Sequence, residues 1–120
     1  MSLADLSELA GTLGLSHQAV YADSINVEAF RERLKASLQH ANSYALVNYD
    51  RRALKQSGIG HISPVGAYDA DRDAFLILDE ASYKYPFTWV PTELLYSAVH
   101  TRAGKEFRGI LFVQSYGLPN

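Results

Sequence analysis

Cysteine is absent from this 120-residue sequence, and that absence excludes a whole class of chemistry. The chain supplies no disulfide, no thiolate ligand for a metal and no cysteine nucleophile of its own. The missing residue says little about the redox compartment, because a chain without cysteine suits either environment.

A basic excess is also lacking. The 11 Lys and Arg residues are outnumbered by 13 Asp and Glu, for a formal net charge of −2. Phosphates would not be neutralised by such a chain, so we expect no nucleic-acid partner. No run approaches the roughly 18 apolar residues that a membrane-spanning helix needs, and the start lacks the basic leader of a secretory signal. We therefore expect no membrane partner and a cytoplasmic location.

The sequence does have apolar material in regular patterns. Hydrophobic residues make up 48% of it, enough for the core of one small domain or a portion of a larger one. Ser2 and Ser24 precede amphipathic segments, and Pro91 suits a first helical turn. The amphipathic pattern starts at once, which is typical of a chain that begins partway into a fold.

Apolar spacing predicts an α+β domain in which an antiparallel sheet packs with about three helices. The predicted helices run from residue 3 to about 11–14, from about 27 to 38 and from 91 to 99, and the predicted strands cover 17–21, 44–49, 61–68, 74–79 and 109–113.

Two of these strands flank the turn-rich segment 69–73, which indicates a hairpin. Folded around Asp71, with Tyr68 opposite Ala74, the hairpin places His61 and Asp79 diagonally on one face. Diagonal pairs lie roughly 7–8 Å apart at Cβ, within reach of a His–Asp hydrogen bond. A carboxylate that holds one ring nitrogen fixes the tautomer and leaves the other nitrogen for a nucleophile's proton.

The pair also has plainer interpretations. A histidine near a glycine turn is usually a hydrogen-bonded structural residue, and an aspartate that closes a strand is commonly a cap. Pro64 favours an edge or a bulge, and one extra residue would move His61 and Asp79 to opposite faces. Spacing alone leaves these interpretations open.

The sequence motifs around His61 and Asp79 resemble those of the phytochelatin synthase family, most clearly from about residue 44 to 113. Several linked motifs at fixed spacing make this a specific signal. The matching segments are Asn48–Leu54 (NYDRRAL), Gly60–Tyr68 (GHISPVGAY), Phe75–Asp79 (FLILD), Tyr83–Pro86 (YKYP) and Trp89–Pro91 (WVP).

The resemblance implies a papain-like fold and a glutathione γ-glutamylcysteinyltransferase that uses a Cys-His-Asp triad. Residues 1–120 would form the C-terminal, His/Asp half of that catalytic domain. His61 matches the catalytic histidine, Asp79 the aspartate that orients it, and Arg108 an arginine that binds the glutamyl end of glutathione. The family implies no tightly bound cofactor, but heavy-metal ions such as cadmium or zinc would arrive as glutathione thiolates.

Departures from the family leave several functions open. The half that carries the cysteine is absent, Glu80 and Ser82 replace a small apolar residue and an arginine, and the loop at 102–107 is shortened and lacks an aspartate. The chain is therefore predicted to need a Cys-bearing partner segment for transfer or for hydrolysis of glutathione. The alternatives are a non-catalytic remnant, a glutathione-binding module or a truncated reading frame. Half a fold would also expose an apolar face, so we expect self-association.

The other conspicuous residues have structural interpretations. Tyr49 is expected to pack in the core, and Glu80 to face solvent. Three basic residues, Arg51, Arg52 and Lys55, are expected to form a solvated turn. Four aromatic residues are expected to form a packing strip beside the hairpin, namely Tyr83, Tyr85, Phe87 and Trp89. The three remaining histidines, His17, His40 and His100, show no metal-ligand spacing, and we predict no metal site.

Overall fold

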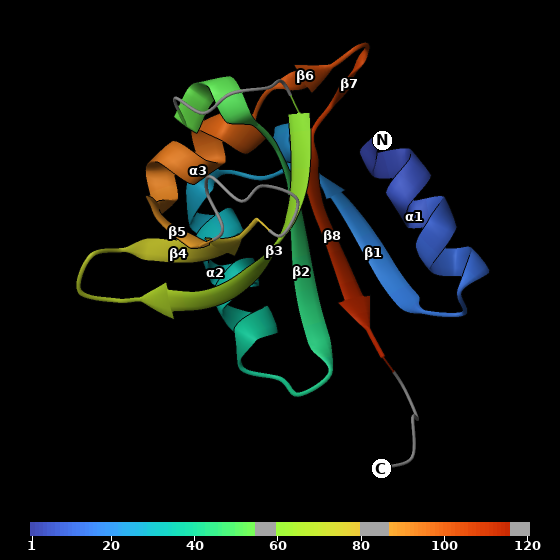
Figure 1. The fold of residues 1–120 in the computed structure, drawn as a ribbon, viewed down its shortest axis with the longest axis horizontal. Helices are drawn as coiled ribbons and strands as arrows, with labels where there is room; N and C mark the ends of the chain where they lie inside the picture. The colour runs from blue at the N-terminus through green and yellow to red at the C-terminus, as the bar shows by residue number, and fades with distance from the viewer. Residues whose placement is uncertain (55–59, 80–86, 116–120) are drawn as a thin grey trace.

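The architecture comes from a computed structural model, which describes residues 1–54, 60–79 and 87–115. A six-stranded antiparallel sheet with the order β1-β8-β2-β3-β4-β5 carries the three helices (Figure 1). The strands are β1 (Ser16–Tyr21), β2 (Ser43–Asp50), β3 (Gly60–Asp69), β4 (Ala74–Leu78), β5 (Phe87–Pro91) and β8 (Gly109–Gln114), and a small hairpin pairs β6 (Arg102–Ala103) with β7 (Glu106–Phe107).

Helices α1 and α2 begin after residues whose side chains bind a free N–H group of the first turn. Helix α1 (Leu3–Thr12) starts with a capping box in which the Ser2 hydroxyl accepts from the Asp5 N–H and the Asp5 carboxylate accepts from the Ser2 N–H. Asn26, rather than the expected Ser24, caps α2 (Val27–Leu38). Ser24 instead ends the short 3₁₀ helix η1 (Ala22–Ser24). The third helix, α3 (Thr92–Val99), follows Pro91, which makes no side-chain cap.

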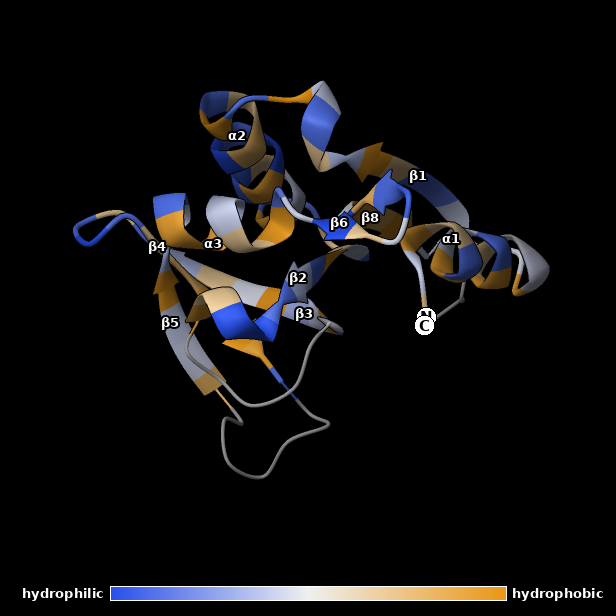
Figure 2. Ribbon diagram, turned by 90° about the horizontal axis from the view of Figure 1, so that it is seen from above, coloured by the Kyte–Doolittle hydropathy of each residue, from blue (hydrophilic) through white to orange (hydrophobic). Residues whose placement is uncertain are grey.

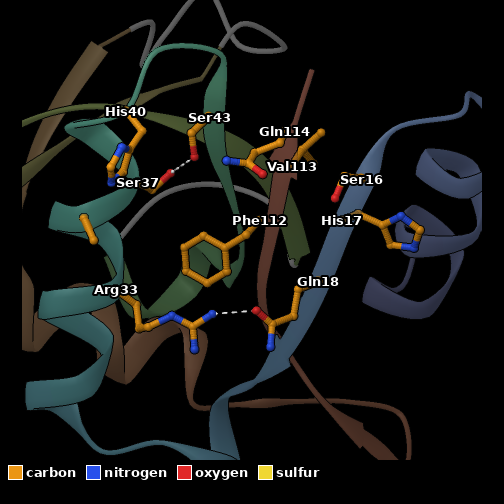
Figure 3. A pocket seen from close by; sticks show the side chains of 11 residues that line it. Ser16, His17, Gln18, Arg33, Ser37, His40, Ser43, Phe112, Val113 and Gln114 are labelled. Carbon is orange, nitrogen blue, oxygen red and sulfur yellow. Dashed lines mark hydrogen bonds between the residues drawn. The ribbon is translucent and has the colours of Figure 1, made fainter. Parts of the chain in front are cut away.

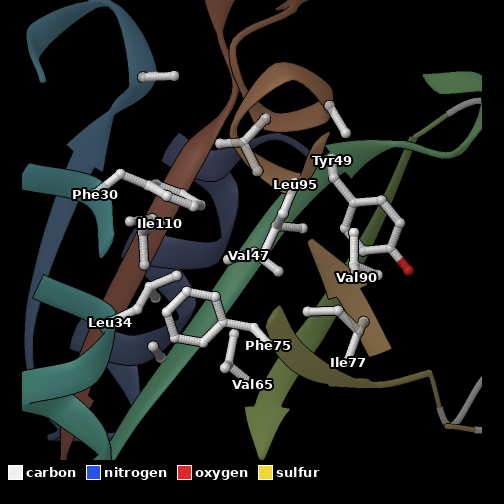
Figure 4. Close-up of a cluster of buried hydrophobic side chains, with 14 residues drawn as sticks. Phe30, Leu34, Val47, Tyr49, Val65, Phe75, Ile77, Val90, Leu95 and Ile110 are labelled. Atoms are coloured by element: carbon white, nitrogen blue, oxygen red, sulfur yellow. The ribbon is translucent and has the colours of Figure 1, made fainter. Parts of the chain in front are cut away.

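Alternation along the strands separates two apolar clusters. Val47 pairs with Ile110 and belongs to the larger cluster, which packs one face of the sheet against α2 and α3 (Figure 4). Leu46 pairs with Leu111, and Leu111 packs with α1 on the other face. Figure 2 shows α1 beside β1 and β8, away from α2 and α3. The predicted α+β class, antiparallel sheet and three helices are therefore confirmed, while the papain-like assignment stays a prediction.

Two strands differ from the sequence prediction. The hairpin pairs Tyr68 with Phe75, one residue away from the predicted register, because Asp69 still pairs with Ala74 and the turn is one residue shorter than expected. A β-bulge at Gly66 then restores the predicted register, and Val65 pairs with Ile77. Phe87 to Pro91 form the edge strand β5, which the sequence did not indicate.

Candidate functional site

His61 and Asp79 come together on the α2/α3 face of the sheet. His61 lies near the start of β3, and Asp79 directly follows β4. The Nε2 atom of His61 is 2.9 Å from Oδ1 of Asp79, and the Asp79 side chain is only 2% exposed. The N–H direction is not aligned on Oδ1, which accepts no other hydrogen bond from the described residues. Contacts of this kind commonly tighten when substrate binds.

The bulge at Gly66 produces this arrangement. Beyond the bulge Val65 pairs with Ile77, and the same register extended by two residues brings Asp79 opposite Ser63, two residues from His61. Without the extra residue, His61 and Asp79 would lie on opposite faces. The sequence prediction of a shared face is thus correct, although the irregularity lies at Gly66 and not at Pro64.

The second oxygen of Asp79 binds Arg51. Arg51 opens the short 3₁₀ helix η2 (Arg51–Leu54) directly after β2, and its Nη2 donates to Oδ2 of Asp79. Both side chains are buried. The expectation that Arg51 lies in a solvated basic turn is wrong, because the guanidinium turns inward. Arg52 is exposed and binds Asp50, and Lys55 lies outside the described residues.

Tyr49 and Ser63 are neutral neighbours of His61 and Asp79. Tyr49 lies directly opposite His61 on β2, with ring centroids 6.0 Å apart in an edge-to-face contact. Its hydroxyl lies 3.3 Å from the Ser63 hydroxyl, and the predicted burial of Tyr49 is confirmed. Burial is the main cause of a lowered His61 pKa, reinforced by the Arg51 charge and opposed by Asp79. The imidazole is therefore neutral at pH 7.

This geometry defines what the pair can do chemically. The 2.9 Å approach of Oδ1 of Asp79 favours the tautomer that carries its proton on Nε2, which leaves the lone pair on Nδ1. A neutral imidazole oriented in this way can accept a proton from a thiol or hydroxyl and return it to a leaving group.

A pocket of about 540 Å³ lies beside the pair, and His61 and Arg108 both line it. Arg108 is 5% exposed and donates from Nη1 to the Thr101 hydroxyl and the Arg102 carbonyl. Its buried Nε has no hydrogen-bond partner among the described residues. A Cβ on Gly60 would lie 3.0 Å from Nη2 of Arg108, so glycine leaves room for the guanidinium. The remaining lining residues are Met1, Ser2, Asn48, Ile62 and Ala103.

A second pocket lies between α2 and strands β1 and β8. It measures about 290 Å³ and contains Arg33, which donates to Gln18 and lies over Phe112 (Figure 3). His40 lies on the α2 side, whereas His17 points away to the far side of β1, where its Nδ1 lies 2.9 Å from the Leu15 carbonyl oxygen. The two histidines therefore do not converge.

Several other predicted residues can now be placed. Phe87 and Trp89 are 67% and 38% exposed, so they form no buried packing strip. The Arg72 guanidinium lies over the Trp89 ring at 5.0 Å. Tyr83 and Tyr85, like Glu80 and Ser82, fall outside the described residues. His100 stacks between Tyr96 and Phe107.

Two other kinds of site have no candidate in the described ranges. No three side chains of the metal-binding types cluster in residues 1–54, 60–79 and 87–115. Within the same ranges, no helix has the length and apolar character required to cross a lipid bilayer.

Comparison with known proteins agrees with the motifs. The model of the phytochelatin synthase family matches residues 1–110. Glutathione gamma-glutamylcysteinyltransferase 3 of Lotus japonicus is 40% identical over 107 residues, covering 88% of this chain and 22% of its own length. Glutathione gamma-glutamylcysteinyltransferase 2 of Arabidopsis thaliana is 40% identical over 91 residues, or 76% of this chain and 20% of its own length.

A fungal relative extends the match. Glutathione gamma-glutamylcysteinyltransferase of Schizosaccharomyces pombe is 29% identical over 121 residues, covering 99% of this chain and 29% of its own. The chain thus spans about a fifth to a third of the length of these relatives. Because the family match covers most of its residues, the chain belongs to the phytochelatin synthase family.

Proposed function

We propose that this chain supplies the acid–base pair of a glutathione γ-glutamylcysteinyltransferase whose nucleophilic cysteine comes from a separate segment. The observation that carries the proposal is the 2.9 Å approach of His61 Nε2 to the buried Asp79 carboxylate, next to a pocket that also contains Arg108. The family membership and the names of the relatives support this reaction class.

The proposed reaction uses Nδ1 of His61 twice. This atom takes the proton of the partner segment's cysteine, and the thiolate attacks the Cys–Gly peptide carbonyl of glutathione. The imidazolium then protonates the departing glycine amine, and a γ-glutamylcysteinyl thioester remains on the cysteine. His61 next removes a proton from a second glutathione or from water, so that transfer or hydrolysis regenerates the thiol.

Arg108 is the proposed contact for the glutamyl end of the substrate. Its guanidinium is always charged and can bind a carboxylate through two N–H groups, and its Nε is unpaired in the described structure. The aspartate that the family places before this arginine is missing here, and the β6–β7 hairpin turns at Gly104 and Lys105 instead. Cadmium or zinc would enter as glutathione thiolates and therefore as part of the substrate.

Restoring the cysteine tests the proposal. The region of the Lotus japonicus relative that precedes the matched residues would be fused to the N-terminus of this chain, and glycine release from glutathione would be measured. We expect no release by the chain alone and clear release by the fusion. The His61→Ala fusion should be inactive, while His40→Ala serves as the matched control. Release by the unfused chain, or by the His61→Ala fusion, would refute the assigned role.

A second candidate function is glutathione binding without catalysis. The buried, partly unpaired Arg108 beside an open pocket favours it. Calorimetry with γ-glutamylcysteine should then show binding that Arg108→Met weakens at least about tenfold, because a charge-assisted hydrogen bond contributes roughly 1.5–3 kcal/mol. The control is Arg102→Met, since Arg102 lies exposed over Phe107. Binding unchanged by Arg108→Met would exclude this pocket.

A further inference from the structure

Arg51 and Arg52 are adjacent in sequence but have opposite environments. The Arg52 side chain is 65% exposed and folds back on Asp50, two residues earlier. The Arg51 side chain is 11% exposed and reaches Asp79, 28 residues away. Arg51 therefore occupies a position between the end of β2 and the end of β4, directly behind the proposed acid–base pair.

The burial of this ion pair is not explained by stability. Removing two charges from water costs about as much as their attraction returns, and apolar pairs of similar volume are often equally stabilising. When the carboxylate of a buried ion pair also contacts a histidine, the pair can orient that carboxylate toward the imidazole ring. One Asp79 oxygen is held by Arg51, so only the other oxygen is presented to Nε2 of His61.

We propose that Arg51 is a positioning residue for the proposed transferase: its hydrogen bond to one oxygen of Asp79 aims the other oxygen at His61. This inference rests on the role proposed above for the His61–Asp79 pair. The guanidinium donates from Nη2 to Oδ2 of the buried carboxylate and so limits the rotation of this group. Its positive charge also opposes protonation of the nearby ring, so that His61 is held ready as a base.

The charges that face His61 are few within the described residues. Asp79 favours the imidazolium and Arg51 disfavours it, while burial disfavours it more strongly than either charge. Tyr49 contributes a neutral ring edge from β2, and Arg108 shares the pocket wall from the residue before β8. Removal of Arg51 alone should therefore leave Asp79 unopposed, and the pKa of His61 should rise.

Nuclear magnetic resonance of ¹⁵N-histidine-labelled chain tests this without any cysteine. In the wild type, His61 should carry its proton on Nε2 and titrate below the usual value of about 6.5. Arg51→Met should raise the His61 pKa, because the Asp79 charge is then unopposed, and should mix the two ring tautomers. Arg51→Lys keeps the charge but loses the Nη2 donor at this position, so the His61 pKa should stay close to the wild type while the tautomer preference weakens. Arg52→Met is the matched control and should change neither.

An unchanged His61 pKa and tautomer in Arg51→Met would overturn the proposal. If that variant fails to fold, Arg51→Met with Asp79→Asn should fold, because neither group is then a buried, unpaired charge. A double variant that stays unfolded would show that Arg51 serves the fold apart from Asp79, and would equally overturn the proposal. Inactivity of the cysteine-bearing fusion, in contrast, would remove the transferase function while leaving these spectra unaffected.

Discussion

Arg31 on α2 binds Asp73 in the β3–β4 turn through two parallel hydrogen bonds, from Nε at 3.0 Å and from Nη2 at 2.9 Å. The same carboxylate accepts from the Tyr68 hydroxyl and the Thr92 hydroxyl. The Asp73 carbonyl accepts from the Thr92 N–H at the start of α3, where Pro91 offers no side-chain cap. One turn residue thus connects two helices with the hairpin that carries the candidate site.

Asp73→Asn should destabilise the chain in a pH-dependent way. The Arg31 guanidinium is the main cause that lowers the Asp73 pKa from 3.8 to about 2. A depressed folded-state pKa means that the stabilisation is present above pH 3.8 and disappears as the pH falls through about 2. Because the Asp73 side chain is 42% exposed, we expect a loss of about 1–2 kcal/mol at pH 7 after allowing for solvent screening. Urea unfolding at several pH values measures it.

Asparagine is a suitable replacement because Asp73 has φ 48, a left-handed conformation that asparagine tolerates. Asp71→Asn in the same turn is the control, since Asp71 is exposed. If the stability difference between the wild type and Asp73→Asn stayed constant between pH 7 and pH 2, the carboxylate charge would contribute nothing.

Asp79→Asn should be much more costly at neutral pH. It leaves the buried Arg51 guanidinium without its counter-charge, a change that typically removes about 3–5 kcal/mol. Asp69→Asn breaks an exposed pair with Arg72 and should cost far less, because exposed ion pairs are screened by solvent. Thermal and urea melts followed by circular dichroism would compare the two. Equal losses would mean that the Arg51–Asp79 pair is solvated in solution.

Gly109→Ala should disrupt the edge of the sheet. Gly109 pairs with Tyr21, and a Cβ there would lie 2.1 Å from the Val20 carbonyl oxygen and 2.9 Å from the Tyr21 Cα. Backbone atoms in a ladder cannot yield as a flexible side chain does, so we expect a loss of about 3 kcal/mol or more in unfolding free energy.

The matched control is Gly11→Ala. A Cβ at Gly11 would lie 3.3 Å from a carbon of the His17 ring, which can move, and alanine favours the helix by about 0.5–1 kcal/mol. Hydrogen exchange of the β1 amides would show whether the strand detaches in Gly109→Ala. Full protection of β1 in that variant would contradict the predicted clash.

The sequence was sufficient to predict elements whose apolar spacing matches one buried face. Helix α2, for example, buries Phe30 and Leu34 as its pattern required. Strand β5 was not predicted because it is an edge strand with exposed Phe87 and Trp89 and a terminal proline. Its aromatic residues suggested packing, whereas an edge strand leaves one side in solvent.

At the candidate site, the alternation of residues along the strands predicted the His61–Asp79 pair, whereas the contact of Arg51 with Asp79 depends on the tertiary structure. Alternation was enough to place His61 and Asp79 on one face, although a shorter turn and a bulge at Gly66 had to compensate for each other. The role of Arg51 was not accessible in this way. In the sequence, Arg51 next to Arg52 indicates a solvated basic turn. Only the pairing of β2 with β3 and of β3 with β4 brings Arg51 to Asp79.

The apolar groove between α1 and strands β2, β3 and β8 should make copies of this chain associate. The groove measures about 300 Å³, has almost no polar lining, and includes Leu13 and Tyr44, which are 65% and 54% exposed. Contiguous apolar surface of this kind favours contact with a second copy. Sedimentation velocity at increasing concentration should detect association by the wild type, and Leu13→Glu should abolish it by placing a charge in the groove.

Phe87→Glu, on an equally exposed apolar residue at the opposite edge of the sheet, should leave association unchanged. A wild type that stays monomeric, or association lost in Phe87→Glu but kept in Leu13→Glu, would mean that the groove is not the contact surface.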